Sequence, residues 1–430
     1  MVSWQFGAGL GWLREEGSVV WNPPGTFVRF VSTISTASNP AQAANEAVAA
    51  TRLELGGADP NLVLAFVSAD HRDVAREIMA LIGSALPSAL LLGCTARSVI
   101  GGGREIEEGP GLALIAATLP GVSLCPFHVE SGREAALVEG QFGSCFGRLQ
   151  PTVASIVLVD PFSIDAGTLL GALDRVAPDA VHVGGLASGG RDPGENQLFL
   201  AGDVRRAGAV GVALAGAVEA RAVVAQGCRP IGEPMFVTAV RDNVVLGLDG
   251  RPPLDVIRDL YAKLGDRDRQ LCRDSLFLGL AMGESRESFG AGDFLVRNLL
   301  GADRDSGGLT IGAVLNDVRV VQFHLRDPAT AEADLGLRLS EAARAAGGRP
   351  PAGGLLFSCL GRGAALYGRP DFETTLAQRH LGGTPIGGFF CNGEIGPVVG
   401  RTFLHGYTSS LLLLQQRSPV PVAGAGPQPI

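Results

Sequence analysis

Apolar runs and amphipathic segments alternate in the first part of the chain. The continuous apolar run at 62–67 predicts a buried strand, and residues 90–93 predict a second one. Between them, the helical spacing of apolar residues predicts a helix over 70–85. A strand–helix–strand unit of this kind implies parallel strand pairing with a right-handed crossover. A further helix, over 40–54, is predicted before this unit.

Short apolar segments separated by Gly and Pro turns continue from residue 111. They predict strands at 111–118, 122–129, 153–160, 180–184, 196–201, 206–215, 219–225, 235–240 and 243–247. A single helix, over 165–177, interrupts this series. The close spacing of the strands indicates a mixed sheet with antiparallel extensions.

The second half repeats this theme after a turn at 249–253. Helices are predicted over 252–263 and 327–344, the latter with Asp327 as N-cap and Pro328 at its first position. The predicted strands are 275–281, 293–297, 309–312, 318–325, 354–358 and 385–390. We expect a mixed α/β (α+β) fold of two domains, whose partly antiparallel sheets are flanked by helices. The expected division is an N-terminal arm at 1–60, domains at 61–250 and 251–410, and a tail at 411–430, with the ligand cleft between the domains or in the second.

Composition excludes several classes of protein. Hydrophobic residues make up 46% of the chain and charged residues 18%, which is too apolar for a disordered protein. The net charge of −8 and the lack of a basic stripe argue against nucleic acid as a partner. The seven cysteines form no C-x-x-C pair, so neither a disulfide framework nor a zinc ribbon is implied. Since no signal peptide or membrane-spanning helix is predicted, we expect a cytoplasmic protein without membrane insertion.

Three glycine-bounded segments follow predicted strands and carry the candidate chemistry. The first, at 93–105, could line a ligand site with backbone N–H groups or form a tight glycine turn. The second is at 357–363, and the third runs from 387 to 397 and on to His405. Ligands of open α/β sheets collect at the carboxyl ends of strands, where the second and third segments lie. The candidate ligand-binding residues are Cys359, Arg362, Cys391, Asn392, Glu394 and His405.

These residue types are suited to an amino-acid-like ligand. Arg362 could bind a ligand carboxylate with two hydrogen bonds, and Glu394 could accept a ligand ammonium group. The alternative is that Arg362 and Glu394 form a buried ion pair that holds two loops together. A positive φ at Gly393 is expected to turn Asn392 and Glu394 toward the 359–363 loop.

Long motifs in these segments resemble those of the FIST domain family. The segment GCTARSVIGGGREIEEGPGLAL (93–114) resembles the signature of the FIST N-terminal domain. GGLLFSCLGRG (353–363), GGFFCNGEIGPV (387–398) and FLHGYT (403–408) resemble that of the FIST C-terminal domain. The resemblance implies a bacterial sensory protein of signal transduction that binds amino acids or related metabolites. Because no output segment is attached, it also implies a signalling partner encoded separately.

Three alternative functions remain open from the sequence. In an enzyme, Cys359 or Cys391 would be the nucleophile and His405 the base, but cysteines after buried strands are commonly small hydrophobes, so we expect no enzyme. Cys359, beside Arg362, is nevertheless expected to have a lowered pKa and high reactivity. A second alternative function is that of a protein-interaction scaffold that binds no ligand.

A haem-based gas sensor is the other alternative. The candidate ligands are His71, His128, His182, His324, His380, His405 and Cys125. His405 is the best of these because it lies within a family motif. Cys125 and His128 are three apart on a predicted strand, so they face opposite sides. No hydrophobic haem box is evident, and we expect no cofactor.

Overall fold

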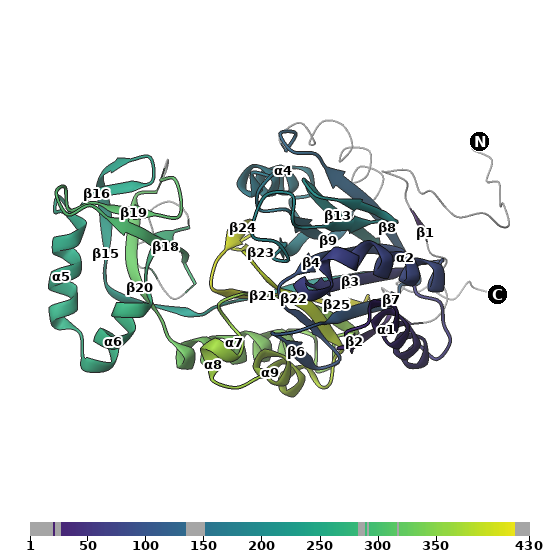
Figure 1. Ribbon diagram of the computed structural model, residues 1–430. Helices are drawn as coiled ribbons and strands as arrows, with labels where there is room; N and C mark the ends of the chain where they lie inside the picture. The colour runs from purple at the N-terminus through teal and green to yellow at the C-terminus, as the bar shows by residue number, and fades with distance from the viewer. Residues whose placement is uncertain are drawn as a thin grey trace, which may run out of the picture.

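The computed structural model describes residues 20–21, 27–134, 151–282, 289, 292–315 and 318–417. Two parts of the expected division lie outside the described residues. They are residues 1–19 and 22–26 of the N-terminal arm and residues 418–430 of the tail. The described chain forms a large body and a smaller barrel, which lie side by side in Figure 1. The mixed α/β fold predicted from the sequence is confirmed.

The body contains three sheets. The first has the order β1 (Val20–Trp21), β8 (Val122–Val129), β13 (Ala209–Gly216), β9 (Thr152–Val159), β10 (Val181–Leu186), β23 (Glu394–Val398), β24 (Arg401–His405). The second has the order β12 (Asp203–Arg205), β11 (Leu198–Leu200), β4 (Leu90–Ala96), β3 (Leu62–Ser68), β7 (Leu112–Thr118), β2 (Arg29–Ser35). The third has the order β14 (Val218–Gln226), β25 (Thr408–Gln416), β21 (Gly353–Cys359), β22 (Ile386–Cys391), β5 (Val99–Gly101), β6 (Arg104–Ile106). Apolar residues from all three sheets share one core.

Helices cover the outer faces of these sheets. The second sheet is covered by α1 (Pro40–Glu54) and α2 (Ala75–Ala85), and a 3₁₀ turn (Ala69–Val74) precedes α2. The first sheet is covered by α4 (Ala166–Val176). The third sheet is covered by α7 (Pro328–Ala345) and α9 (Phe372–Leu381). As predicted, β3 and β4, which precede and follow α2 in the sequence, pair in parallel. The side chain of Asp327 accepts a hydrogen bond from the backbone N–H of Ala329, which confirms it as the N-cap of α7.

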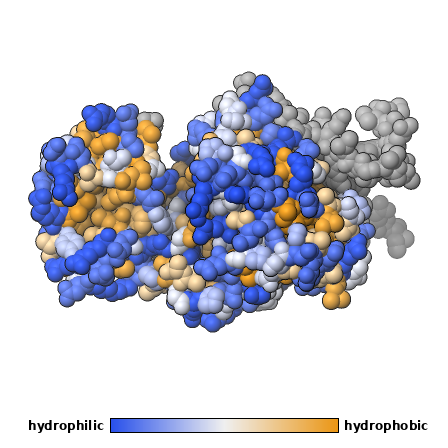
Figure 2. Space-filling view, in the orientation of Figure 1, coloured by the Kyte–Doolittle hydropathy of each residue, from blue (hydrophilic) through white to orange (hydrophobic). Residues whose placement is uncertain are grey.

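The barrel is closed and has its own apolar core. Its strands are β15 (Cys228–Arg241), β16 (Val244–Leu248), β19 (Leu309–Ile311), β18 (Phe294–Ala302), β17 (Leu276–Ala281) and β20 (Val320–Arg326), accompanied by α5 (Pro253–Lys263) and α6 (Asp266–Asp274). The chain enters the barrel after Gly227 and leaves it before Asp327, and the Asp327 N–H donates to the Gly227 carbonyl. Apolar side chains gather on the barrel in Figure 2, and Phe236 is 64% exposed there.

These spatial units do not follow the division expected near residue 250. Residue 250 lies in the turn between β16 and α5, which is part of the continuous stretch of chain that forms the barrel unit. Conversely, β14 and the β5–β6 hairpin come from the first half of the chain but complete the third sheet. The expected tail at 411–430 also needs correction, because residues 411–416 belong to β25. This strand pairs with β14 on one side and β21 on the other, and its leucine side chains are buried on the faces of the sheet.

Two expectations from composition have structural counterparts. Cys125 is disulfide-bonded, which corrects the expectation of a chain without disulfides. None of the helices in the described residues is long and apolar enough to cross a membrane.

Candidate functional site

The second and third glycine-bounded segments meet in the third sheet, which the sequence left open. The strands β21 and β22 are parallel neighbours, and Cys359 lies opposite Cys391 at their carboxyl ends. The chain then returns through β23 and β24 to β25, so that Glu394 comes close to Cys359 and to Arg362. Four of the six candidate residues therefore share one largely buried region, namely Cys359, Arg362, Cys391 and Glu394.

Arg362 has no solvent-exposed side-chain surface, and each of its nitrogens donates to a protein group. Its Nε lies 2.5 Å from Glu373 Oε1, Nη2 lies 2.5 Å from the Tyr367 hydroxyl, and Nη1 lies 3.2 Å from the Tyr407 carbonyl oxygen. The other Glu373 oxygen accepts from Ser409 Oγ at 3.0 Å. Arg362 is thus held in a buried ion pair, but its partner is Glu373. The alternative from the sequence, an ion pair between Arg362 and Glu394, is wrong because Glu373 on α9 lies within hydrogen-bond distance of Arg362.

Glu394 is a buried acid with few partners. Its Oε2 accepts from the backbone N–H of Thr408 at 3.1 Å, while Oε1 has no hydrogen-bond partner in the described part of the chain. Burial raises the pKa of Glu394 well above its ordinary value. Burial therefore favours the neutral form of this carboxyl group.

The two thiols and the histidine of the motifs are not poised for nucleophilic chemistry. Burial, with a contribution from Glu394, raises the pKa of Cys359 to about 12, so the expected lowering is wrong. Burial likewise raises the pKa of Cys391 well above its ordinary value. His405 Nε2 lies 3.0 Å from the Gly396 carbonyl oxygen, and burial lowers its pKa to about 4. Loss of hydration outweighs the nearby Arg362 charge at Cys359.

The turn at Gly393 differs from its prediction. Its φ is not in the left-handed region, which corrects the expected positive φ. Glycine is needed there for close packing instead, since a Cβ would lie 2.9 Å from a methyl carbon of Leu404 and 3.1 Å from one of Leu186. Asn392 is exposed, and its Nδ2 lies 3.5 Å from the Ala187 carbonyl oxygen. Of the two polar neighbours, only Glu394 comes close to Arg362.

The first glycine-bounded segment forms the β5–β6 hairpin. Gly102 and Gly103 have φ values of 55° and 74°, so the tight-turn interpretation holds for residues 101–104, while residues 93–96 belong to β4. The hairpin extends the third sheet beside β22, where Val99 pairs with Phe389.

Two acidic residues after this hairpin turn reach the buried cluster, and the sequence analysis missed them. Glu105 accepts from the backbone N–H of Thr374 at 2.7 Å, near the start of α9. Glu107 accepts from that of Ala364 at 2.7 Å, at the first residue of α8 (Ala364–Tyr367). Burial, followed by the charge of Glu373, raises the pKa of Glu105 to about 8. The acidic run within the 93–114 motif was the available signal.

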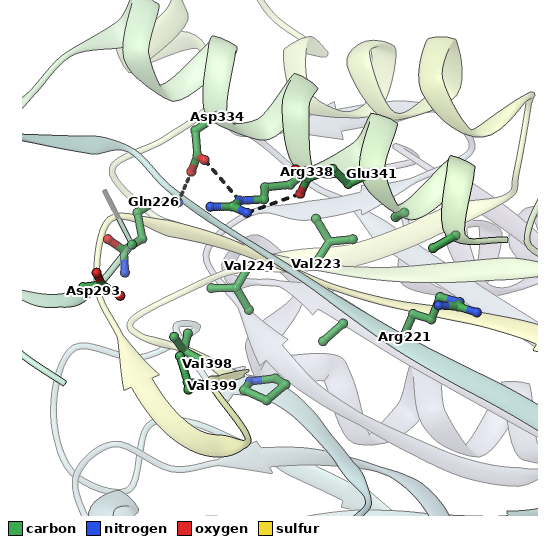
Figure 3. Close-up of a pocket in the computed structure, with 15 residues that line it drawn as sticks. Arg221, Val223, Val224, Gln226, Asp293, Asp334, Arg338, Glu341, Val398 and Val399 are labelled. Atoms are coloured by element: carbon green, nitrogen blue, oxygen red, sulfur yellow. Dashed lines mark hydrogen bonds and ion pairs between the residues drawn. The ribbon is translucent and has the colours of Figure 1, made fainter. Parts of the chain in front are cut away.

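An open groove of about 600 Å³ lies beside the buried cluster, between the body and the start of β18. It is lined by Arg221, Ala222, Val223, Val224, Gln226, Gly292, Asp293, Asp334, Arg338, Glu341, Ala342, Ala345, Pro397, Val398 and Val399. Figure 3 shows β14 running through it, with α7 on one side and the turn after β23 on the other. Gly227, the residue after β14, has space for no side chain, because a Cβ there would lie 2.7 Å from Arg362 Nη1. The groove and the cluster are therefore neighbours.

An ionic network lies along the α7 side of the groove (Figure 3). Asp334 Oδ2 accepts from the backbone N–H of Gln226 at 2.7 Å, and Oδ1 lies 3.4 Å from Arg338 Nε. Arg338 Nη1 lies 3.3 Å from Glu341 Oε2. Burial raises the pKa of Asp334, although Arg338 and the Gln226 N–H oppose this. The network fixes the α7 wall against β14.

Two residues that line the groove each have a buried side-chain atom with no partner among the described residues. These atoms are Gln226 Oε1 and Arg221 Nε. The Gln226 side chain is oriented by its Nε2, which donates to the Phe294 carbonyl oxygen at 2.9 Å. A free acceptor therefore lies at one end of β14 and a free donor five residues away. Within the described chain, no cluster of His, Cys, Asp and Glu is placed to hold a metal ion.

Comparison with known proteins gives two groups of similar sequences and structures. An uncharacterized protein of Mycobacterium tuberculosis is 39% identical over 384 residues, covering 88% of this chain and 98% of the relative. An uncharacterized protein of Mycobacterium bovis is 36% identical over 381 residues, covering 88% and 97%. Two cyanuric acid hydrolase structures, one from A. caulinodans, align at a TM-score of 0.31 with 9% and 10% identity, covering 90% and 91% of this chain and all of theirs. That structural likeness is too low to carry an argument.

Family models match most of the chain. The FIST N domain matches residues 61–251, and the FIST C domain matches residues 253–397. The motifs at 93–114 and 353–363 fall within these matches, in the same order. The chain therefore belongs to the FIST domain family.

Proposed function

We propose that this protein is a sensor that binds an amino acid or a related zwitterionic metabolite in the groove beside β14. FIST domains are associated with sensory signal transduction and small-ligand binding. The observation that carries the proposed site is the pair of unpartnered buried atoms, Gln226 Oε1 and Arg221 Nε, in residues that line an open groove. A buried polar atom without a partner costs about 1–3 kcal/mol, so a ligand that satisfies it gains affinity.

The groove offers one site for each charge of a zwitterion, and these sites lie at its two ends, so a single amino acid would use one of them. An ammonium group would donate to Gln226 Oε1 at the end where Asp293 and Asp334 also lie. A carboxylate would accept from Arg221, which has an unused donor. The described lining holds two arginines and three acidic residues, so a strongly anionic ligand is disfavoured. Val224 and Val398 provide apolar surface for the rest of the ligand.

The residues of the family motifs have a supporting role in this proposal. Arg362 and Glu373 hold the loops that lie behind Gly227, next to the groove. Direct ligand contact by Cys359, Arg362, Cys391, Asn392, Glu394 and His405 stays a prediction. High thiol pKa values and a neutral His405 support a binding protein rather than an enzyme. A signalling partner and a cytoplasmic location are part of the proposal: the partner rests on the family resemblance, and the location on the expectation from the sequence.

Ligand screening with matched variants tests this function. Thermal shift identifies binders among the amino acids and short unblocked peptides, and calorimetry then compares the wild type with Arg221→Gln. Loss of a charge-assisted hydrogen bond of about 1.5–3 kcal/mol lowers affinity roughly ten- to a hundredfold. Arg258→Gln on α5, where the arginine side chain is 76% exposed, is the control and leaves affinity unchanged.

Three outcomes would overturn the proposed function or its site. If no zwitterion in the panel binds the wild type, a scaffold without ligand becomes the better interpretation. If the purified protein shows a Soret absorption band, a haem-based sensor does. Equal affinities for the wild type and Arg221→Gln would remove the groove as the site.

A further inference from the structure

We infer that the ligand of this groove is a short extended peptide, bound as an added strand along the free edge of β14. The inference rests on the proposed function, because it specifies the ligand class of the same site. It is carried by three observations: the unpaired edge of β14, the five-residue spacing of Arg221 and Gln226 along it, and the residues of the groove walls. Strand addition to an exposed sheet edge is a recurring mode of peptide recognition.

The edge of β14 that faces the groove is unpaired within the described chain. β14 pairs with β25 along its whole length, from Val218 opposite Gln416 to Gln226 opposite Thr408. On its other side it has no strand neighbour among the described elements, since it is the first strand of its sheet. Such an edge presents a row of backbone donors and acceptors that another extended chain can pair with.

The backbone direction along this edge follows from one hydrogen bond. The Gln226 N–H donates to the Asp334 side chain, so it points away from β25. In an antiparallel pair, backbone groups point alternately toward and away from the partner strand. The N–H and C=O groups of Val224 and Ala222 therefore also point away from β25, and both residues line the groove. Two residues with outward groups offer up to four ladder hydrogen bonds to a bound peptide.

The spacing of the polar ends selects a peptide over a free amino acid. Arg221 and Gln226 are five residues apart on β14, so their backbones are about 17 Å apart at about 3.4 Å per residue and their side chains leave opposite faces of the sheet. The ammonium and carboxylate of one amino acid are attached to the same carbon, so they cannot reach both ends. An extended peptide of about five residues spans this length. With its ammonium at Gln226 and its carboxylate at Arg221, it runs antiparallel to β14.

The groove walls suit the alternating side chains of such a strand. Side chains of an extended peptide project alternately to opposite faces. The α7 wall presents small Ala342 and Ala345, and the opposite wall presents Pro397 to Val399. Val399 is 72% exposed and has a φ of 49°, a conformation that costs a β-branched residue energy. The strained turn holds an apolar side chain at the rim of the groove, where a peptide side chain can cover it.

The test uses the pentapeptide Ala-Val-Ala-Val-Ala with free termini and the full chain. Calorimetry compares this peptide with the same peptide N-methylated at its second and fourth residues, with the same peptide N-methylated at its third residue, with free alanine and with free valine. One of the two methylated peptides blocks the amides that face β14, so one of the pair is expected to bind at least about tenfold more weakly than the parent. The other peptide is its matched control, because its methyl groups face away from β14.

Amide hydrogen exchange by NMR locates the peptide without altering the protein. Saturating peptide is expected to slow exchange at Ala222 and Val224 at least about tenfold, since ladder hydrogen bonds protect amides. Val223, whose N–H already faces β25, is the internal control and is expected to change little. Arg221→Gln is expected to weaken peptide binding by about tenfold or more, and Arg258→Gln to leave it unchanged.

The outcomes separate the two proposals. If free amino acids bind the wild type in an Arg221-dependent manner and the peptides do not, the strand-addition inference is overturned and the proposed function stands. If the parent and both methylated peptides bind equally, or Ala222 and Val224 gain no protection, strand addition is also overturned. If neither amino acids nor peptides bind, both proposals fail.

Discussion

Replacing Glu105 by glutamine is expected to change how stability depends on pH. Burial and the neighbouring Glu373 raise the pKa of Glu105 from 4.5 to about 8. Between these pH values the folded protein keeps a proton that the unfolded chain has released. The free energy of unfolding therefore falls as pH rises through this interval. The favourable contribution of the neutral acid is complete below pH 4.5 and is lost by about pH 8.

The size of this effect follows from the two pKa values. At about 1.4 kcal/mol per pKa unit, the interval between 4.5 and about 8 corresponds to a loss of at most about 5 kcal/mol. Glutamine retains the oxygen that accepts from the Thr374 N–H and carries no charge at any pH, so Glu105→Gln avoids the loss. The variant and the wild type are expected to be about equally stable at pH 5, and the variant more stable by several kcal/mol at pH 8.5.

Urea unfolding followed by circular dichroism, at pH values from 5 to 9, measures this difference. Contributions from other titrating groups, Glu394 among them, affect both proteins and cancel in the comparison. Glu341→Gln is the control, because this glutamate is half-exposed at the rim of the groove and its removal leaves the pH dependence as in the wild type. Parallel stability curves for the wild type and Glu105→Gln would refute the assignment of a neutral buried acid at this position.

Three further predictions concern the buried cluster. Glu373→Gln, which removes the buried counter-ion of Arg362, is expected to lower the free energy of unfolding by about 3–5 kcal/mol, whereas Glu394→Gln, which removes no ion-pair partner, is expected to cost much less. Equal losses in urea unfolding at pH 7 would contradict this pairing. Native Cys359 is expected to be alkylated more slowly than Cys272, and mass-spectrometric mapping that finds Cys359 faster would contradict its raised pKa. Gly393→Val is expected to destabilise by about 1–3 kcal/mol through overcrowding, and an unchanged Tm would contradict the packing argument.

Much of the fold could be predicted from the sequence because its elements are strongly patterned. The helix over 40–54 and the strand over 122–129 have the observed bounds, and the parallel pairing of β3 and β4 follows from their buried apolar runs. The barrel could not be predicted, since it depends on which strands close on one another across residue 250. Strand pairing over such sequence distances leaves no local pattern.

The candidate site was predicted in part. The meeting of the 357–363 and 387–397 segments follows from the parallel pairing of two buried strands. The partner of Arg362 could not be identified, because Glu373 lies on a helix whose position is set by tertiary packing. The groove was missed because its walls come from β14, α7 and the turn after β23, which are far apart in sequence. Nothing in the local pattern distinguishes Gln226 from other polar residues at the end of a strand.

A crystal structure of the protein with a zwitterionic binder from the screen tests the central claim most directly. The account predicts a ligand in the groove beside β14, with its ammonium group within hydrogen-bond distance of Gln226 Oε1 or its carboxylate within that distance of Arg221 Nε. A ligand bound elsewhere, with both of these atoms still without a partner, would contradict it.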